Sequence, residues 1–283
     1  MTRPTAVFSV LHPGNIRYFK EFMESLATQI SECDVLLACD DVPDIGHLLR
    51  AHQSSLNVIV LPVKGTLVQI RQASIDWLRG LPYRYYVFAD SDDIQPNDRV
   101  LAAVSCLSQY QVVAHDLLPF GAGGLSKPYW SKRLLNGQQL SRADIWQSNV
   151  FGLGNTSIRR EVLLQFPALP ENLLAIDWFL FYHALGNQSG VFTHQGAVHY
   201  RQHSENLAGT AQVTVERLKN ICRVKMAHYS ALGSTEAQEQ RSALSGLLEK
   251  LEKDKKYAQE AVFQLNKQPI SYFWWEETNY LYG

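Results

Sequence analysis

Short apolar runs alternate with amphipathic stretches through the first half of this 283-residue chain. Apolar residues with a high strand propensity fill positions 6–10, 35–38, 58–61 and 85–89. Between these runs, apolar side chains recur at helical spacing over 16–30 and 67–78. Strands that alternate with amphipathic helices indicate βαβ units. The sequence therefore predicts an α/β fold with a mostly parallel central sheet flanked by helices.

Polar and acidic residues follow these predicted strands. Parallel sheets bind ligands at the carboxyl ends of their strands, so residues at those positions are candidates for a binding site. The candidates are His12, Asp40, Asp41, Asp90, Asp92 and Asp93. Their clustering predicts one polar site at this edge of the sheet.

The densest part of this set is the segment Asp90-Ser91-Asp92-Asp93. Its carboxylates repel one another unless a positive charge lies between them, and Mg²⁺ is a typical partner because it takes oxygen ligands and bridges phosphates. Two alternatives stay open. Acidic residues ahead of Pro96 would also favour the start of a helix, and an Asp-x-Asp spacing also fits a phosphatase.

Two further segments carry candidate residues. Asp177 lies within the apolar segment 175–180, where a carboxylate is costly without a partner or a function. It suits either a general base that faces a cleft or an acid that interacts with a helix dipole. His199 and His203 flank Arg201, a residue type well suited to phosphate oxygens. For each histidine alone, a packed or surface position is the alternative.

Four motifs in this order resemble those of family-2 inverting glycosyltransferases of the GT-A fold, of the bacterial type. They are Val-Leu-Leu-Ala-Cys-Asp-Asp at 35–41, the Gly-to-Arg stretch at 65–73, Phe-Ala-Asp-Ser-Asp-Asp at 88–93, and Ile-Asp-Trp at 176–178 followed by Tyr-Arg-Gln-His-Ser-Glu-Asn at 200–206. The resemblance covers roughly residues 5–210. It implies a GT-A-like catalytic domain over 1–210 and leaves 211–283 as a C-terminal helical extension.

The resemblance implies a reaction and a role for each matching residue. The reaction is transfer of a sugar, with inversion, from a nucleotide-sugar donor to a hydroxyl of a glycan or lipid-linked acceptor in bacterial surface polysaccharide synthesis. Asp177 would be the catalytic base, and a divalent cation, Mn²⁺ or Mg²⁺, would be the cofactor. The nucleotide would contact His12, Asp40, Asp41, Arg71 and Asp90, the metal would be held by Asp92, Asp90 and His203, and the diphosphate would contact Arg201 and His203.

The middle of the chain predicts an acceptor site. Gly121, Gly123 and Gly124 would form a hinge for a loop over the acceptor, with Tyr129 and Trp130 as stacking surfaces for a sugar ring. We expect Asn155 to bind the acceptor as well. An ordinary surface loop is the alternative.

Two other functions fit parts of this pattern. A sugar nucleotidyltransferase also combines βαβ units with metal-binding acids, although it would have a longer glycine-rich basic loop than the segment 12–15. A non-catalytic nucleotide-sugar-binding scaffold that dimerises through its C-terminal helices is the other alternative. Only turnover distinguishes the scaffold from an enzyme.

The C-terminal extension has helical periodicity. Apolar residues recur in a heptad pattern over 244–265 that is interrupted at Lys255. Its partner would be the helix predicted over 213–232 or the same helix of a second copy. The aromatic tail over 272–282 would either pack on the catalytic domain or contact a membrane interface, where Trp and Tyr are favoured.

Composition excludes several classes of protein. The net charge of −1 argues against a dedicated nucleic-acid binder. The four cysteines form no Cys-x-x-Cys pair, so they indicate a reducing compartment rather than a zinc site. Since we find neither a signal peptide nor a membrane-spanning run, we expect a cytoplasmic protein, or one held at the inner face of the membrane through its aromatic tail.

Overall fold

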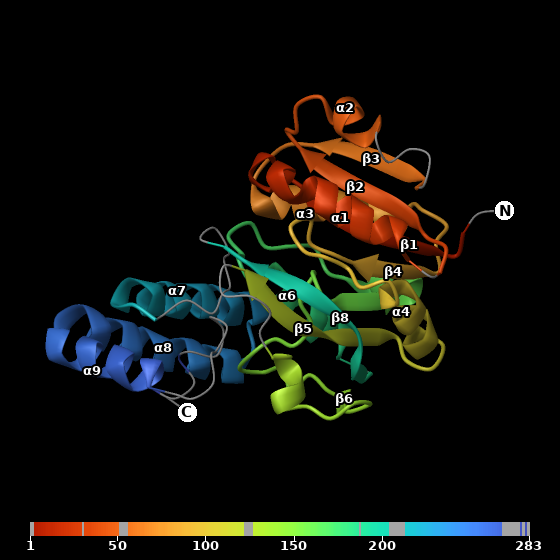
Figure 1. Cartoon of the computed structure of the whole chain (residues 1–283). Helices are drawn as coiled ribbons and strands as arrows, with labels where there is room; N and C mark the ends of the chain where they lie inside the picture. Colours follow the sequence, from red (N-terminus) through yellow and green to blue (C-terminus); the bar gives the residue numbers. More distant parts are fainter. Residues whose placement is uncertain are drawn as a thin grey trace.

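The computed structural model describes residues 3–29, 31–50, 56–121, 127–186, 188–203, 213–267, 278 and 281. A central sheet with helices on both faces forms the body of the protein, and a bundle of three helices projects from one side of it (Figure 1). The predicted α/β fold with a mostly parallel sheet and a C-terminal helical extension is confirmed.

One sheet of eight strands is formed within the described residues, in the order β3-β2-β1-β4-β7-β5-β8-β6. The strands are β1 (Thr5–Leu11), β2 (Asp34–Asp40), β3 (Val58–Val63), β4 (Tyr85–Phe88), β5 (Val112–Gly121), β6 (Gln139–Leu140), β7 (Thr156–Arg159) and β8 (Gly190–Gln202). Strands β3, β2, β1 and β4 run parallel to one another, and β5 runs parallel to β8. Strand β7 pairs antiparallel with β4 and β5, and β6 with β8.

Helices cover both faces of this sheet. They are α1 (Ile16–Ala27), α2 (Ile45–Arg50), α3 (Leu67–Arg79), α4 (Arg99–Leu107), α5 (Arg160–Gln165) and α6 (Ile176–Ala184). Successive residues of a strand point to opposite faces, so Val7 of β1 packs in the cluster that contains α1 and α4, and Phe8 packs in the cluster that contains α3 and α6. Apolar alternation and helical periodicity thus build two cores, one on each face.

Two predicted elements differ from the structure in extent. The sequence pattern predicts a helix over 173–185, and the helix of the structure begins at Ile176. The pattern also predicts a strand over 197–201, which is the end of the longer β8. Strand β5 lies in a region for which the sequence indicated no regular structure. The polar pair His115 and Asp116 interrupts the apolar pattern of this strand. Both side chains are nevertheless buried, and each forms a hydrogen bond with a backbone group.

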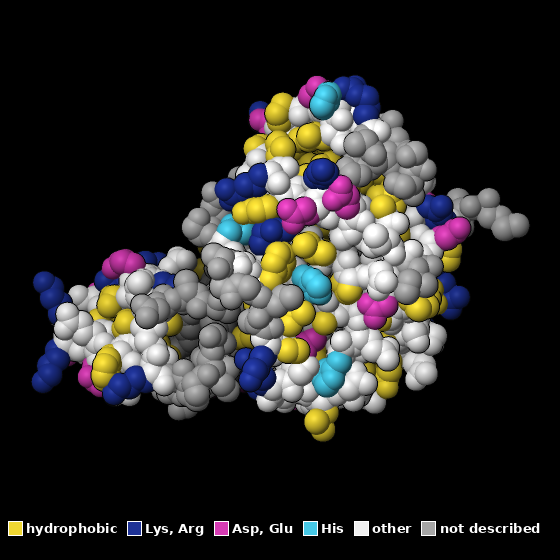
Figure 2. Space-filling model, in the orientation of Figure 1, with side chains coloured by type: hydrophobic (Ala, Val, Ile, Leu, Met, Phe, Trp, Pro, Cys, Tyr) yellow, Lys and Arg dark blue, Asp and Glu magenta, His cyan; other side chains and the backbone are white. Residues whose placement is uncertain are grey.

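The C-terminal bundle consists of α7 (Val215–Leu232), α8 (Thr235–Lys253) and α9 (Lys255–Asn266). Gly233 takes a left-handed conformation after α7, and Ser234 then caps α8 by accepting a hydrogen bond from the Ala237 amide. This Gly-Ser pair allows a tight turn, so α8 packs back along α7 of the same chain. Figure 2 shows charged side chains of both signs on the outer surface of the bundle.

The heptad pattern over 244–265 therefore spans two helices rather than one. The Asp254 carboxylate accepts a hydrogen bond from the Tyr257 amide and caps α9, so the interruption noted at Lys255 is where the chain begins a new helix. Leu244, Leu247 and Leu251 are buried, and α7 supplies the intrachain partner. Dimerisation through these helices stays a prediction.

The aromatic tail over 272–282 lies outside the described residues except for Thr278 and Leu281. Thr278 is fully buried, and its Oγ1 accepts a hydrogen bond from Lys225 Nζ of α7 at 3.1 Å. At this position the tail packs on the bundle. None of the helices in the described parts of the chain is long and apolar enough to cross a membrane.

The Lys225–Thr278 hydrogen bond gives a first prediction. Thr278→Val should lower the free energy of unfolding by about 1–3 kcal/mol, because a buried ammonium loses a hydrogen-bond acceptor. Thr278→Ser keeps the hydroxyl and should restore most of that loss. Urea unfolding measures both, and equal stability of the Val variant and the wild type would contradict the prediction.

Candidate active site

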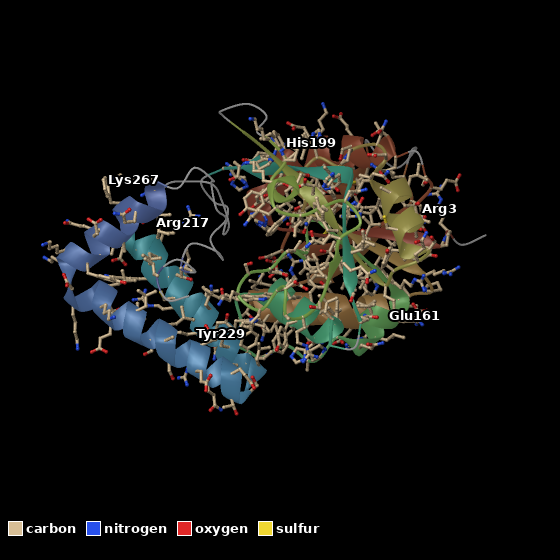
Figure 3. The ribbon with its side chains drawn as sticks, turned by 90° about the horizontal axis from the view of Figure 1, so that it is seen from below. Arg3, Glu161, His199, Arg217, Tyr229 and Lys267 are labelled. Atoms are coloured by element: carbon tan, nitrogen blue, oxygen red, sulfur yellow. The ribbon has the colours of Figure 1, made fainter. Side chains whose placement is uncertain are left out.

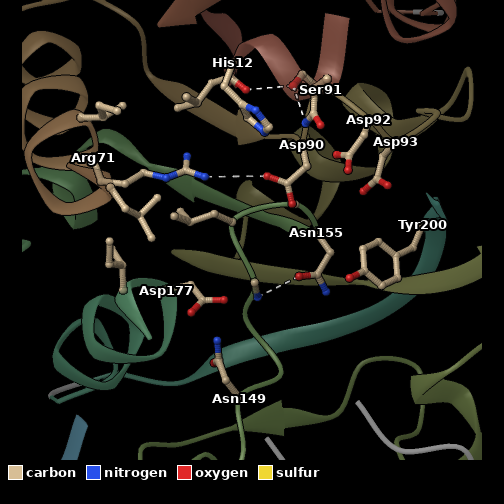
Figure 4. Close-up of a pocket in the computed structure, with 18 of the residues that line it drawn as sticks. His12, Arg71, Asp90, Ser91, Asp92, Asp93, Asn149, Asn155, Asp177 and Tyr200 are labelled. Atoms are coloured by element: carbon tan, nitrogen blue, oxygen red, sulfur yellow. Dashed lines mark hydrogen bonds and ion pairs between the residues drawn. The ribbon is translucent and has the colours of Figure 1, made fainter. Parts of the chain in front are cut away.

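A pocket of about 480 Å³ opens at the carboxyl ends of the parallel strands. Its walls come from the ends of β1, β2, β4 and β8, from the first turns of α3 and α6, and from the loop 149–155 (Figure 4). This is the edge of the sheet at which the sequence predicts a site.

The acidic segment after β4 forms a tight turn that is anchored to β1. Ser91 is fully buried, donates to the Val10 carbonyl at 2.9 Å, and accepts from Asn15 Nδ2 at 3.1 Å. The Asp93 amide closes the turn on the Asp90 carbonyl at 3.2 Å. The buried serine thus fixes the turn, and the acidic residues on either side of it line the pocket.

Asp93 links this turn to β8. Its Oδ1 accepts a hydrogen bond from the Arg201 amide at 2.8 Å, whereas its buried Oδ2 has no hydrogen-bond partner in the described residues. Burial, together with the charges of Asp92 and Asp90, raises the pKa of Asp93 well above its usual range. The neutral form of this carboxyl is therefore favoured in the folded protein.

Asp92 meets His203, with Nε2 and Oδ2 separated by 2.9 Å. The neighbouring Arg201 holds the same turn, since its Nε donates to the Asp92 carbonyl at 2.6 Å and its Nη2 pairs with Glu21 of α1 at 2.7 Å. The guanidinium also lies 4.5 Å from the ring centroid of Tyr18. Arg201 does not line the pocket. Through these contacts Arg201 holds the acidic turn, and its contact with a diphosphate stays a prediction.

Asp90 faces the pocket opposite Arg71 of α3. Arg71 Nη2 lies 4.0 Å from Asp90 Oδ1, and 39% of the Asp90 side chain is exposed. The pKa of Asp90 is raised to about 6, mainly by burial among protein atoms and then by the charges of Asp92 and Asp177, while Arg71 opposes the shift. Gly154 packs directly on this carboxylate, and a Cβ there would collide with Asp90 Oδ2.

Asp177 occupies the first turn of α6 on another wall of the pocket. Its Oδ1 accepts a hydrogen bond from the Trp178 amide at 2.7 Å. The Asn149 side chain, whose amide group exchanges hydrogen bonds with the Phe151 backbone, points toward the same carboxylate and lowers its pKa. Burial nevertheless raises the pKa of Asp177 to about 6, against the effects of Trp178, Arg71 and Asn149. Figure 4 shows Asn149 directed toward Asp177, and Arg71 directed toward Asp90.

The structure brings most of the predicted site residues together. The pocket is lined by His12, Asp40, Arg71, Asp90, Asp92, Trp130, Asn155, Asp177 and His203. Asp41 is not among them, because its exposed side chain pairs with Lys64 at 2.9 Å and its left-handed backbone, with φ of 51°, directs the chain into a turn. The predicted nucleotide contact of Asp41 is therefore not supported.

Of the predicted acceptor residues, Tyr129 is packed in the core, whereas Trp130 and Asn155 line the pocket although they are almost fully buried. Tyr129 is 2% exposed and does not line the pocket. Trp130 is 6% exposed, with the Arg133 guanidinium 4.7 Å from its ring centroid. Stacking of a sugar ring on Trp130 stays a prediction. Asn155 is buried and spans the loop, donating to the carbonyls of His115 and Val150. Gly121 ends β5, and the other predicted hinge glycines, Gly123 and Gly124, lie outside the described residues.

Sequence reasoning missed several residues of the pocket. Asn149, Gly152 and Gly154 belong to one loop, and Tyr200 extends from β8. Tyr200 belongs to the motif Tyr-Arg-Gln-His, but only the arginine and the histidine of this motif were predicted as site residues. The pKa of Tyr200 is raised well above its usual range by burial and by the acidic turn, so its phenol stays protonated. Asn149 carried no recognisable signal, because its partner Asp177 is 28 positions away.

The acidic turn has the chemistry of a partial metal site. No group of three or more His, Cys, Asp or Glu side chains could hold a metal ion in the parts of the chain that the structure describes. However, Asp90 and Asp92 both line the pocket, and burial together with the charge of Asp92 raises the pKa of Asp90. Mg²⁺-type ions bind through one or two carboxylates and take their other ligands from water and phosphates. The residues present fit such an ion.

The contact between Gly154 and Asp90 gives a second prediction. Gly154→Ala should lower the free energy of unfolding by about 1–3 kcal/mol, because the added methyl displaces the carboxylate or the loop. Gly246→Ala is the matched control. A Cβ there meets no atom within 4 Å, and alanine favours the helix. Thermal unfolding compares the two, and a Gly154→Ala variant as stable as the control would contradict the prediction.

The raised pKa of Asp177 gives a third prediction. Its pKa is about 6 in the folded protein, but about 3.9 in an unfolded chain, so its ionisation destabilises the fold as pH rises through this window. Asp177→Asn should therefore match the wild type near pH 4 and exceed it by about 1–3 kcal/mol above pH 6. Urea unfolding from pH 4 to pH 8 measures the difference. A difference that does not change with pH would refute the linkage.

Comparison with known proteins identifies the fold. No protein-family model and no curated protein sequence matches this chain. Among solved structures, S. aureus TarS 1-349 in complex with UDP-GlcNAc superposes with a TM-score of 0.60 at 16% identity, covering 94% of this chain and 77% of that chain. The mannosyltransferase PcManGT from Pyrobaculum calidifontis, in complex with GDP-Man and Mn²⁺, gives 0.54 at 12% identity, with 93% and 74% covered. The chain thus has a GT-A-like fold.

Proposed function

We propose that this protein transfers a sugar from a nucleotide-sugar donor to an acceptor hydroxyl, with inversion, and that Asp177 is the general base. One observation carries the proposal. Asp177 and the acidic turn face the same pocket from different walls, and the pKa of Asp177 is raised to about 6. The fold shared with structures that hold UDP-GlcNAc or GDP-Man supports the same function.

The wall formed by the strand ends would bind the donor. Asp40 and His12 follow β2 and β1, where a nucleotide would lie, and carboxylate and imidazole groups can hydrogen-bond a base or a ribose. Arg71 adds a positive charge on the α3 side of the pocket. The diphosphate would then lie near Asp92 and His203.

A divalent cation, Mn²⁺ or Mg²⁺, would be held by Asp92 with Asp90 and His203. When bound, it supplies positive charge to the leaving diphosphate. The Arg201 contacts keep the Asp92 main chain in place for this role. The neighbour structures with Mn²⁺ support a divalent cation, although they are only 12% identical to this chain.

Asp177 would activate the acceptor. At neutral pH its carboxylate is ionised, because its pKa is about 6, and it can take the proton of the acceptor hydroxyl during attack. The acceptor oxygen forms a bond to the anomeric carbon as the carbon–phosphate oxygen bond breaks, and the electron pair leaves with the nucleoside diphosphate. Attack from the face opposite the diphosphate inverts the anomeric centre.

The acceptor in this proposal is a glycan or lipid-linked glycan of bacterial surface polysaccharide synthesis, as the sequence motifs imply. Asp177 lies in the first turn of α6, whereas the other acidic residues that line the pocket, Asp40 and those of the acidic turn, follow strands. A donor would therefore lie on the strand ends and the base on α6. The acceptor would have to enter between them.

Donor binding and turnover test the proposal. Calorimetry with UDP-GlcNAc and GDP-Man, with and without Mn²⁺, should detect binding of one donor, and release of nucleoside diphosphate should report slow hydrolysis. Asp177→Asn should bind that donor normally but lose turnover by roughly 10²–10⁴, the usual contribution of general base catalysis. Asp92→Asn should lose the Mn²⁺-dependent part of binding.

Asp76→Asn is the matched control, because Asp76 is an exposed acid of α3 that pairs with Arg79 and lies outside the pocket. Loss of donor binding in Asp177→Asn would mean that Asp177 belongs to the nucleotide site or to the fold. Binding without turnover in the wild type would favour the scaffold function. Formation of a nucleotide sugar from a nucleoside triphosphate and a sugar phosphate would favour a nucleotidyltransferase.

A further inference from the structure

Helix α7 of the C-terminal bundle contacts α6, the helix that carries Asp177, and extends from there to one side of the body (Figure 1). Asp177 itself accepts a hydrogen bond from the Trp178 amide, and the Asn149 side chain points toward its carboxylate. Both of these groups belong to segments that contact α7. The end of α7 that holds Tyr229 lies at the body of the protein, and the end that holds Arg217 lies far from it (Figure 3).

His228 of α7 fixes the ring of Trp178. The two rings stack with centroids 3.8 Å apart and planes 8° from parallel, and both side chains are fully buried. Neither ring nitrogen of His228 has a hydrogen-bond partner in the described residues. Burial and the neighbouring charges of Lys225 and His183 lower the pKa of His228 to about 3. The imidazole is therefore a neutral, flat packing surface for the tryptophan next to the base.

Tyr229, the next residue of α7, fixes the loop that contains Asn149. Its hydroxyl donates to the Trp146 carbonyl at 2.8 Å, and its ring lies 5.2 Å from the Trp146 ring. The Trp178 indole Nε1 donates to the neighbouring carbonyl of Ile145 at 2.6 Å. Segment 145–149 is thus held from two directions before it presents Asn149 to Asp177.

We propose that His228 and Tyr229 are positioning residues for Asp177, so that the C-terminal bundle acts as the support of the catalytic base. This inference rests on the proposed function, because it assigns a purpose to the support of Asp177. Displacement of a reacting group by about 1 Å can cost roughly 100-fold in rate, so residues that fix a base need not touch the substrate. One continuous hydrophobic cluster joins α6 to the bundle, which gives this support its rigidity.

Different charged groups surround His228 and Asp177. Lys225 of α7 and His183 of α6 face His228, whereas Arg71 and Asp90 face Asp177. Substitution of His228 or Tyr229 by a neutral side chain therefore removes no charge from the surroundings of Asp177. A change in Asp177 ionisation in such a variant would report altered geometry.

The experiment compares His228→Ala, His228→Phe and Tyr229→Phe with the wild type in the full-length protein. Donor Kd is measured by calorimetry, kcat by release of nucleoside diphosphate across pH 5–8, and the Asp177 pKa by ¹³C NMR of aspartate-labelled protein, assigned through Asp177→Asn. We expect His228→Ala and Tyr229→Phe to lower kcat by about tenfold to 100-fold, with donor Kd unchanged within about twofold. His228→Phe keeps a flat ring and should recover kcat relative to His228→Ala.

The pH profile separates positioning from general destabilisation. In Tyr229→Phe, the acid limb of kcat and the Asp177 pKa should both move to higher pH, because the Asn149 side chain, which lowers that pKa, is held less firmly. Leu251→Ala is the control, since Leu251 is buried in α8, a helix that packs mainly on α7 and α9. It should lower the melting temperature and leave kcat and the pH profile unchanged.

Unchanged kcat and unchanged Asp177 pKa in His228→Ala and Tyr229→Phe would overturn the inference while leaving the proposed function intact. An equal loss of kcat in Leu251→Ala would overturn it as well. If the wild type turns over no donor, the proposed function fails. In that case the NMR titration still decides whether α7 positions Asp177. A shifted Asp177 pKa in Tyr229→Phe would show that α7 holds Asp177 in place, and an unshifted pKa would overturn this inference.

Discussion

The mutual repulsion of carboxylates in the turn after β4 is the constraint around which the pocket is organised. Asp90, Asp92 and Asp93 are held within four residues, and burial and repulsion raise the pKa of two of them. Ser91 anchors this turn to β1, and Arg201 binds it through both main chain and side chain. A bound cation would supply positive charge that offsets the repulsion between these carboxylates.

The pocket has two walls with different origins. Strand ends of the first half of the chain form one wall, and α6 with segment 145–149 forms the other. The second wall is held in place by α7, whose buried residues belong to the same hydrophobic cluster as those of α3 and α6. A division of the chain near residue 210 therefore separates two segments that share one core and, in our proposal, one active site.

Each wall of the pocket contains a carboxyl group whose ionisation destabilises the folded protein. The pKa values of Asp90 and Asp177 are each raised to about 6 by burial, which means that the charged forms are disfavoured by the fold. Clusters of this kind are typical of functional sites, where a ligand charge or a transferred proton relieves the cost. The hydrogen bond from the Trp178 amide and the nearby Asn149 side chain limit this cost at Asp177, and Arg71 limits it at both residues.

The sequence by itself determined the fold class and the pocket wall formed by the strand ends. Apolar alternation predicts β1 to β4, and the rule that parallel strands share a carboxyl edge brings His12, Asp40 and Asp90 together, because both signals are local. Tertiary structure decided the rest. The burial of Tyr129 and Trp130, the turn that removes Asp41, and the redirection of Arg201 toward Glu21 depend on neighbours far away in the chain. The same holds for Asp177, whose local segment indicated only a costly carboxylate, whereas its partner Asn149 and its support from His228 and Tyr229 arise from packing between distant segments.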